Sequence, residues 1–146
     1  MSVLEVDGLA KAFAGRTIFE AVSLRVEPGS ATAITGPSGT GKTTLLRCLN
    51  GLELADRGSV GVGEARIVGG APHQEQQLAI RALRSRVGFV FQASHLFSHR
   101  TALQNVMEGP LYVKREAPEA ARTRAEALLE KVGVHHRARR QSITRL

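Results

Sequence analysis

Cysteine, aromatic side chains and long apolar runs are all scarce in this chain of 146 residues. Its single cysteine, Cys48, excludes an intramolecular disulfide and fits a reducing cytoplasm. No apolar run approaches the length of a membrane span. The first seven residues carry neither the basic region nor the apolar core of a secretory leader. We therefore expect a soluble intracellular protein that meets a membrane only through a partner.

The length is that of one ordinary domain at most, and a hydrophobic content of 42% supports a core. The formal net charge is +7, and the basic excess is concentrated from Lys114 onward. Such a basic run is most often a solvated face or a loose end. Less often it marks a site for nucleic acid or anionic lipid.

The most informative stretch is a glycine-rich loop in which Gly36-x4-Gly41-Lys42-Thr43 fits the phosphate-binding loop pattern. Glycine at positions 36, 39 and 41 lets the backbone turn tightly and approach an anion, because no Cβ stands in the way. Successive N–H groups at a helix N-terminus then form an anion nest. The pattern arises by chance in roughly one chain of this length in a few hundred, so an ordinary glycine turn is a weak alternative.

The side chains of this loop have distinct predicted roles toward a bound ATP and Mg²⁺. Lys42 supplies a point charge for the β- and γ-phosphates, and the Thr43 hydroxyl is placed to ligate Mg²⁺. Thr44 is within reach of the α-phosphate. The predicted nucleotide-binding residues of the loop are Gly36, Ser38, Gly39, Thr40, Gly41, Lys42, Thr43 and Thr44.

Periodicity and turn residues predict the elements around the loop. Residues 22–26 alternate as a half-exposed antiparallel strand does. Residues 31–35 are typical of a buried strand, and the apolar run at 87–91 is typical of a central parallel strand. Thr101 is a candidate helix cap, Gly109-Pro110 interrupts the chain, and Pro118 opens a helix. We predict strands at 3–7, 22–26, 31–35 and 87–91, a hairpin at 57–70, and helices at 41–50, 73–85, 101–107 and 118–132.

Five parts of the chain, in order, carry a resemblance to one family: Leu9–Phe13, Ala21–Gly29, Gly36–Thr44, Val87–Gln92 with Leu96–His99, and Thr101–Val106 with Glu108–Pro110. In this order they resemble the ATP-binding subunits of ABC transporters. The last part resembles the importers of polar amino acids in particular.

The resemblance implies an α/β P-loop NTPase fold, with a RecA-like core and an N-terminal antiparallel β subdomain. Residues 1–91 would form the nucleotide-binding core, and residues 92–146 the glutamine loop and the start of a helical subdomain. Phe13 would stack on adenine, although a core aromatic is the alternative. Gln92 would reach Mg²⁺ and the attacking water, so that Lys42 and Gln92 are the catalytic candidates, and Thr43 and Gln92 the metal ligands.

The partners implied are transmembrane permease subunits, faced by the loop from Ser94 to Arg100, and a second ATP-binding subunit. The chain would lie on the cytoplasmic face of the cell membrane and would energise import of a small polar solute. The resemblance to the importers of polar amino acids implies that this solute is an amino acid. No nucleic-acid partner is expected.

The family's later motifs are not in these 146 residues. In the family, a Ser-Gly-Gly-Gln signature would follow Leu146, and a catalytic Glu and a switch His would come later. Two alternatives therefore stay open beside the transporter ATPase. One is a non-catalytic binding protein, which either holds nucleotide as a remnant of such a subunit or uses its Arg-rich tail at 137–145 on nucleic acid. The other is a different P-loop enzyme, although a guanine-reading Asn-Lys-x-Asp is absent.

Phosphoryl transfer needs an oriented water and charge opposite the γ-phosphate, in addition to the phosphate loop and Mg²⁺. We therefore predict that the isolated 146-residue chain is poorly stable and does not hydrolyse ATP at a useful rate. A steady-state phosphate-release assay measures this, and turnover that Lys42→Ala abolishes would contradict it.

Overall fold

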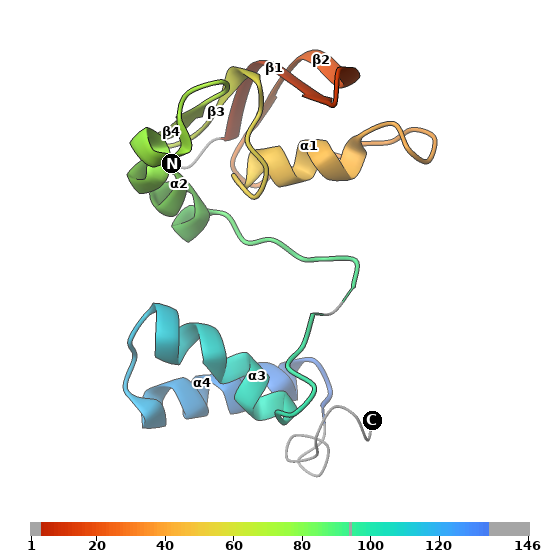
Figure 1. Cartoon of the computed structure of the whole chain (residues 1–146). Coiled ribbons are helices and arrows are strands. Elements are labelled where there is room, and N and C mark those ends of the chain that lie inside the picture. Colours follow the sequence, from red (N-terminus) through yellow and green to blue (C-terminus); the bar gives the residue numbers. More distant parts are fainter. Residues whose placement is uncertain (1–3, 94, 135–146) are drawn as a thin grey trace. The chain divides into compact units, whose positions relative to one another are not determined.

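The computed structural model describes residues 4–93 and 95–134, which fall into two compact units (Figure 1). Unit 1 spans Met1–Val90 and unit 2 spans Phe91–Leu146. All described strands belong to unit 1, whereas the described elements of unit 2 are helical. The assignment of these units to a nucleotide-binding core and a helical subdomain stays a prediction.

Unit 1 is built on one antiparallel sheet of four strands in the order β2-β1-β3-β4. The strands are β1 (Leu4–Phe13), β2 (Arg16–Val26), β3 (Arg57–Val62) and β4 (Ala65–Val68). Ala14 and Gly15 join β1 to β2 with φ of 47° and 79°, the left-handed conformation that two-residue hairpins need. The predicted antiparallel sheet and glycine-rich hairpin are confirmed, and both long strands extend beyond their predicted bounds.

Two helices cover the core of unit 1: α1 (Lys42–Leu49) and α2 (His73–Arg86). The predicted helices at 41–50 and 73–85 are thus confirmed. Helix α1 turns Leu45, Cys48 and Leu49 into the core, at the i, i+3, i+4 spacing of an amphipathic helix. These side chains join one buried cluster with apolar residues of the sheet and of α2: Val6, Leu9, Val60, Val62, Ile67, Ile80 and Leu83.

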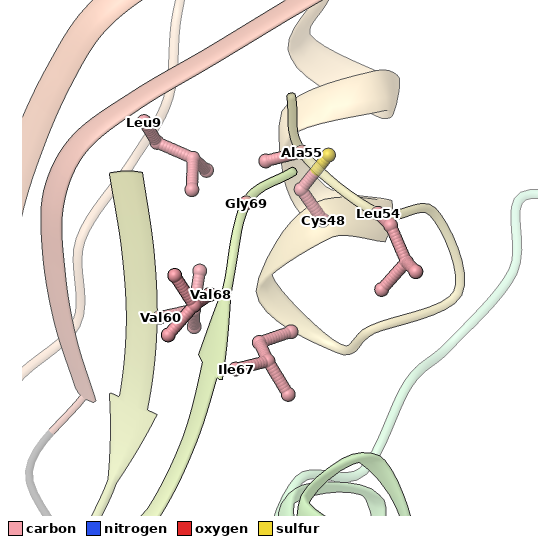
Figure 2. A pocket seen from close by; sticks show the side chains of 8 residues that line it. All are labelled: Leu9, Cys48, Leu54, Ala55, Val60, Ile67, Val68 and Gly69. Carbon is pink, nitrogen blue, oxygen red and sulfur yellow. The ribbon is translucent and has the colours of Figure 1, made fainter. Parts of the chain in front are cut away.

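Cys48 is a core residue, as its spacing on the helix predicts, and only 1% of it is exposed. Figure 2 shows its sulfur close to Ala55, on the side of α1 that faces the strands. Burial raises the pKa of the thiol to about 11 because the thiolate is desolvated there. The side chain is therefore a neutral packing group near pH 7.

The cavity drawn in Figure 2 lies inside this core and is lined by Leu9, Leu54, Val60, Ile67 and neighbouring residues. Its volume is about 10 Å³, which is the lower limit for one water molecule. Its lining is mostly apolar, so it is a packing defect and carries no ligand site.

The predicted strands at 31–35 and 87–91 are wrong, because neither segment is part of a strand. Residues 31–33 are exposed, and so is 95% of Val90. A buried parallel strand requires a parallel neighbour. The one sheet of the described residues is wholly antiparallel and offers none. An apolar run in the sequence is therefore not enough to predict that the segment forms a strand.

Unit 2 contains α3 (Ala102–Glu108), the π-helix η1 (Gly109–Val113) and α4 (Pro118–Lys131). Thr101 caps α3 as predicted, in a capping box with Gln104. The interruption predicted at Gly109-Pro110 is wrong, because the chain continues directly into η1. Pro110 stands in the first turn of η1, where a missing N–H costs little.

The apolar side chains of α4 are only partly buried. Ala121, Ala125 and Leu129 are buried, and the contacts of α4 with α3 and η1 cover this side. Leu128 and Val132 are 48% and 71% exposed. The Arg-rich segment at 137–145 lies outside the described residues. Within the described ranges, no helix has the length and apolar character needed to cross a bilayer.

Candidate nucleotide-binding site

The phosphate loop precedes α1 and owes its shape to three glycines. Gly36, Gly39 and Gly41 have φ of 148°, 80° and 88°, all in the region that disfavours residues with a Cβ. Gly41 is also the N-cap of α1. The sequence prediction that glycine is needed at 36, 39 and 41 therefore matches the backbone of this loop.

The N-terminus of α1 is open toward a ligand. No side chain caps it, and its first turn contains no acidic residue. The N–H of Leu45 donates to the Gly41 carbonyl at 2.8 Å, so the amides of Lys42, Thr43 and Thr44 precede the first helical bond. Such amides carry the positive end of the helix dipole. This arrangement suits a phosphate.

The Lys42 ammonium lies within the loop that precedes it. Its Nζ donates to the Gly36 carbonyl at 2.9 Å and to the Pro37 carbonyl at 2.5 Å. The Thr40 hydroxyl also donates to the Pro37 carbonyl, at 2.9 Å. The cation is therefore held against the carbonyls of the loop, while Ser38, Gly39 and Thr40 are exposed on the loop.

A contact with the sheet fixes the loop at Gly41. A Cβ built on Gly41 would lie 2.5 Å from Cγ2 of Ile18 and 3.3 Å from the Ile18 carbonyl oxygen. Strand β2 therefore packs directly against the N-cap of α1. The role of Ile18 cannot be predicted from the sequence, because nothing in the phosphate-loop pattern indicates which strand touches the loop.

Phe13 ends β1 and is 46% exposed. The Nζ of Lys11 lies over its ring, 4.9 Å from the centroid. Lys11 is itself only 9% exposed and forms ion pairs with Glu53 and Asp56. Lys11 belongs to the segment Leu9–Phe13 that carries the family resemblance, but its role could not be predicted from the sequence, because its ion-pair partners are more than 40 residues away.

Gln92 is exposed and lies in unit 2, two residues after Val90. Next to it, the Phe91 ring meets the His95 ring edge-on, with centroids 4.9 Å apart. The phosphate loop belongs to unit 1, so the shared ligation of one Mg²⁺ by Thr43 and Gln92 stays a prediction.

The available donors fit Mg²⁺ better than a softer metal. Thr43 and Gln92 offer a hydroxyl and an amide oxygen, and hard oxygen ligands are those that Mg²⁺ prefers. Within residues 4–93 and 95–134, no group of three or more His, Cys, Asp or Glu side chains is placed to hold a metal.

The chain matches the model of the ABC transporter family over residues 19–145. Among curated proteins, the chain is 49% identical over 134 residues to the L-cystine transport system ATP-binding protein TcyN of Escherichia coli. It is 47% identical over 132 residues to the L-cystine import ATP-binding protein TcyC of Bacillus subtilis. These matches cover 92% and 90% of this chain but 54% and 53% of the relatives. The chain thus spans about half the length of the curated relatives it matches.

A solved structure supports the predicted fold class. The dimeric ATP-binding cassette MJ0796, in a post-hydrolysis state bound to ADP and Pi, superposes with a TM-score of 0.81 at 25% sequence identity. The match covers 98% of this chain and 62% of that one. The prediction of a P-loop NTPase with an N-terminal antiparallel subdomain is confirmed.

The contact at Gly41 generates a stability prediction with a matched control. Gly41→Ala meets both an unfavourable φ and the Ile18 side chain, whereas a Cβ on Gly39 has nothing within 4 Å. We expect Gly39→Ala to cost about 1–2 kcal/mol from backbone strain. Gly41→Ala should cost a further ~1–3 kcal/mol from overpacking. Chemical denaturation followed by circular dichroism measures both values, and equal losses would contradict the Ile18 contact.

Proposed function

Because the chain belongs to the ABC transporter family, we propose that it is the ATP-binding part of a transporter that imports an amino acid. The proposal extends to the full-length subunit, whose ATP hydrolysis drives import. Two relatives with nearly half of their matched residues identical are named for L-cystine, and this supports an amino acid as the solute. The same similarities do not favour the non-catalytic remnant or another P-loop enzyme.

The observation that carries this proposal is the open N-terminus of α1 behind the glycine loop. The amides of Lys42, Thr43 and Thr44 have no capping side chain, and the Lys42 ammonium is bound to the Gly36 and Pro37 carbonyls of the same loop. Together they offer oriented donors and positive charge to the β- and γ-phosphates of ATP. Gly36, Ser38, Gly39, Thr40 and Gly41 form the rest of the cradle.

The residues of the site divide the work of phosphoryl transfer. Bound Mg²⁺ would supply charge neutralisation between the β- and γ-phosphates. The Thr43 hydroxyl would hold this ion, with Gln92 as a further oxygen ligand that also orients the attacking water. Lys42 would stabilise the negative charge that builds up on the γ-phosphate, since a fixed cation needs no reorganisation there.

Phe13 would bind the other end of the nucleotide. Its half-exposed ring ends β1, and stacking on adenine needs an accessible aromatic face. The ring carries no hydrogen-bonding group, so it would discriminate by shape and stacking rather than by reading the edge of the base.

Permease subunits and a second ATP-binding subunit are the proposed partners, on the cytoplasmic face of the membrane. A dimeric neighbour structure supports the second subunit. For the permease, the loop before α3 presents Leu96 and Phe97, each 50% exposed. The Asn105 side chain of α3 accepts a hydrogen bond from the Phe97 N–H at 2.8 Å and donates one to the Phe97 carbonyl at 3.2 Å. Helix α3 therefore holds this loop in position for docking.

Equilibrium binding of Mg-ATP tests the proposal on the 146-residue chain. We expect Lys42→Ala to weaken binding ~10–100-fold, because a charge-assisted hydrogen bond is lost. Thr43→Ala should weaken binding only when Mg²⁺ is present, and should match the wild type in EDTA. Isothermal titration calorimetry measures these affinities.

Lys131→Ala is the matched control, because Lys131 is an exposed lysine in the last turn of α4. It should bind as the wild type does. The proposal fails if Lys42→Ala and Lys131→Ala bind Mg-ATP equally well, or if a wild-type chain that circular dichroism shows to be folded does not bind it.

A further inference from the structure

Lys11 is a buried cation on β1. The groups that bind its ammonium by hydrogen bonds and ion pairs lie in the segment that follows α1. Its Nζ donates to the Leu54 carbonyl at 2.7 Å, and forms ion pairs with Glu53 at 2.9 Å and Asp56 at 3.3 Å. Burial alone would lower its pKa, but the hydrogen bonds and charges of Glu53 and Asp56 raise it above the ordinary value. The side chain is therefore a fixed ammonium group near pH 7.

The same ammonium lies against the aromatic ring that ends the strand. Lys11 and Phe13 are two residues apart on β1, where the pairing with β2 shifts register between Lys11 and Ala12. The Nζ stands 4.9 Å from the ring centroid, which is within cation–π range. The ring is thus held in place although 46% of the residue is exposed.

Asp56 holds the backbone on both sides of Lys11. Its Oδ2 accepts a hydrogen bond from the Ala12 N–H at 2.7 Å. Its own N–H donates to the Ala10 carbonyl at 2.9 Å. The bond from Ala12 is the main reason that the pKa of Asp56 is lowered, so the carboxylate stays charged near pH 7. The end of β1 is therefore fixed just before Phe13.

These anchors connect the ring to the helix of the phosphate loop. The Arg47 carbonyl, in the last turn of α1, accepts hydrogen bonds from the N–H groups of Leu52 and Glu53, at 2.9 Å and 3.2 Å. Residues 53–56 then bind Lys11. One continuous set of contacts runs from α1 through this segment to Lys11 and the Phe13 ring.

We propose that Lys11 is a positioning residue, which presents the Phe13 ring for stacking on the base of a nucleotide held at the phosphate loop. The inference rests on the proposed function, because it assumes that a nucleotide binds at this loop. A cation held at the ring fixes its orientation before the base arrives. Less side-chain freedom is then lost on binding. Lys11 itself has no contact with the nucleotide in this account.

Comparing the affinities for two ligands distinguishes binding of the base from binding of the phosphates. The ligands are Mg-ATP and Mg-tripolyphosphate, which has no base. We expect Lys11→Met to weaken Mg-ATP binding roughly fivefold, at the lower end of what base stacking contributes, and to leave tripolyphosphate binding unchanged. Lys11→Arg keeps a cation over the ring and should retain most of the ATP affinity. The matched control is Lys131→Met, which should change neither affinity.

A double-mutant cycle shows whether Lys11 acts through Phe13. Phe13→Ala should also lose ATP affinity selectively, and adding Lys11→Met to it should cause no further loss. Equal weakening of both ligands by Lys11→Met would overturn the inference, because it would show general damage. So would an additive double mutant, or an Lys11→Met variant with wild-type ATP affinity.

The wild-type chain offers a readout that does not depend on how the variants fold. Nuclear Overhauser contacts between the Lys11 Hε protons and the Phe13 ring should persist when Mg-ATP is added, and their loss would overturn the inference. If Lys42→Ala weakens both ligands while Lys11→Met changes neither, the proposed function stands and only the inference fails. A wild-type chain that binds neither ligand overturns both.

Discussion

The packing of α1 against the antiparallel sheet is the interaction on which the other features of unit 1 depend. Leu45, Cys48 and Leu49 enter a cluster shared with β1, β3, β4 and α2. Full burial of a leucine is worth about 1.5–3 kcal/mol, whereas an isolated helix of eight residues is not stable in water. The helix therefore exists because the sheet holds it. The phosphate loop before α1 and the segment 53–56 after it are therefore positioned by the same packing.

The two ends of α1 carry different chemistry. The N-terminal end leaves amides without capping side chains, an arrangement unfavourable for the free helix and suited to an anion, and the Lys42 ammonium lies in the loop that precedes it. The C-terminal end leads into residues 53–56. This segment binds the Lys11 ammonium, which lies over the Phe13 ring. Contact between Gly41 and Ile18 ties the loop to β2 as well. A single short helix thus links the proposed phosphate and base ends of the site.

The sequence predicted the parts of this arrangement that local chemistry determines. Glycines at 36, 39 and 41 could be predicted because only they suit such backbone angles, and the Thr101 cap because the Gln104 partner is three residues away. Lys11 and Ile18 could not be given roles, since their contacts join distant segments. The strands predicted at 31–35 and 87–91 failed because an apolar run does not show whether a parallel neighbour lies beside it.

The central claim is that the open end of α1 binds phosphate while the far end of β1 binds the base. Backbone amide and aromatic ring chemical shifts of the labelled chain test it most directly, in titrations with Mg-tripolyphosphate and then Mg-ATP. The account predicts that both ligands shift the amides of Gly39, Gly41, Lys42, Thr43 and Thr44, and that only Mg-ATP shifts the Phe13 ring. Loop amides that stay unmoved by both ligands would contradict it.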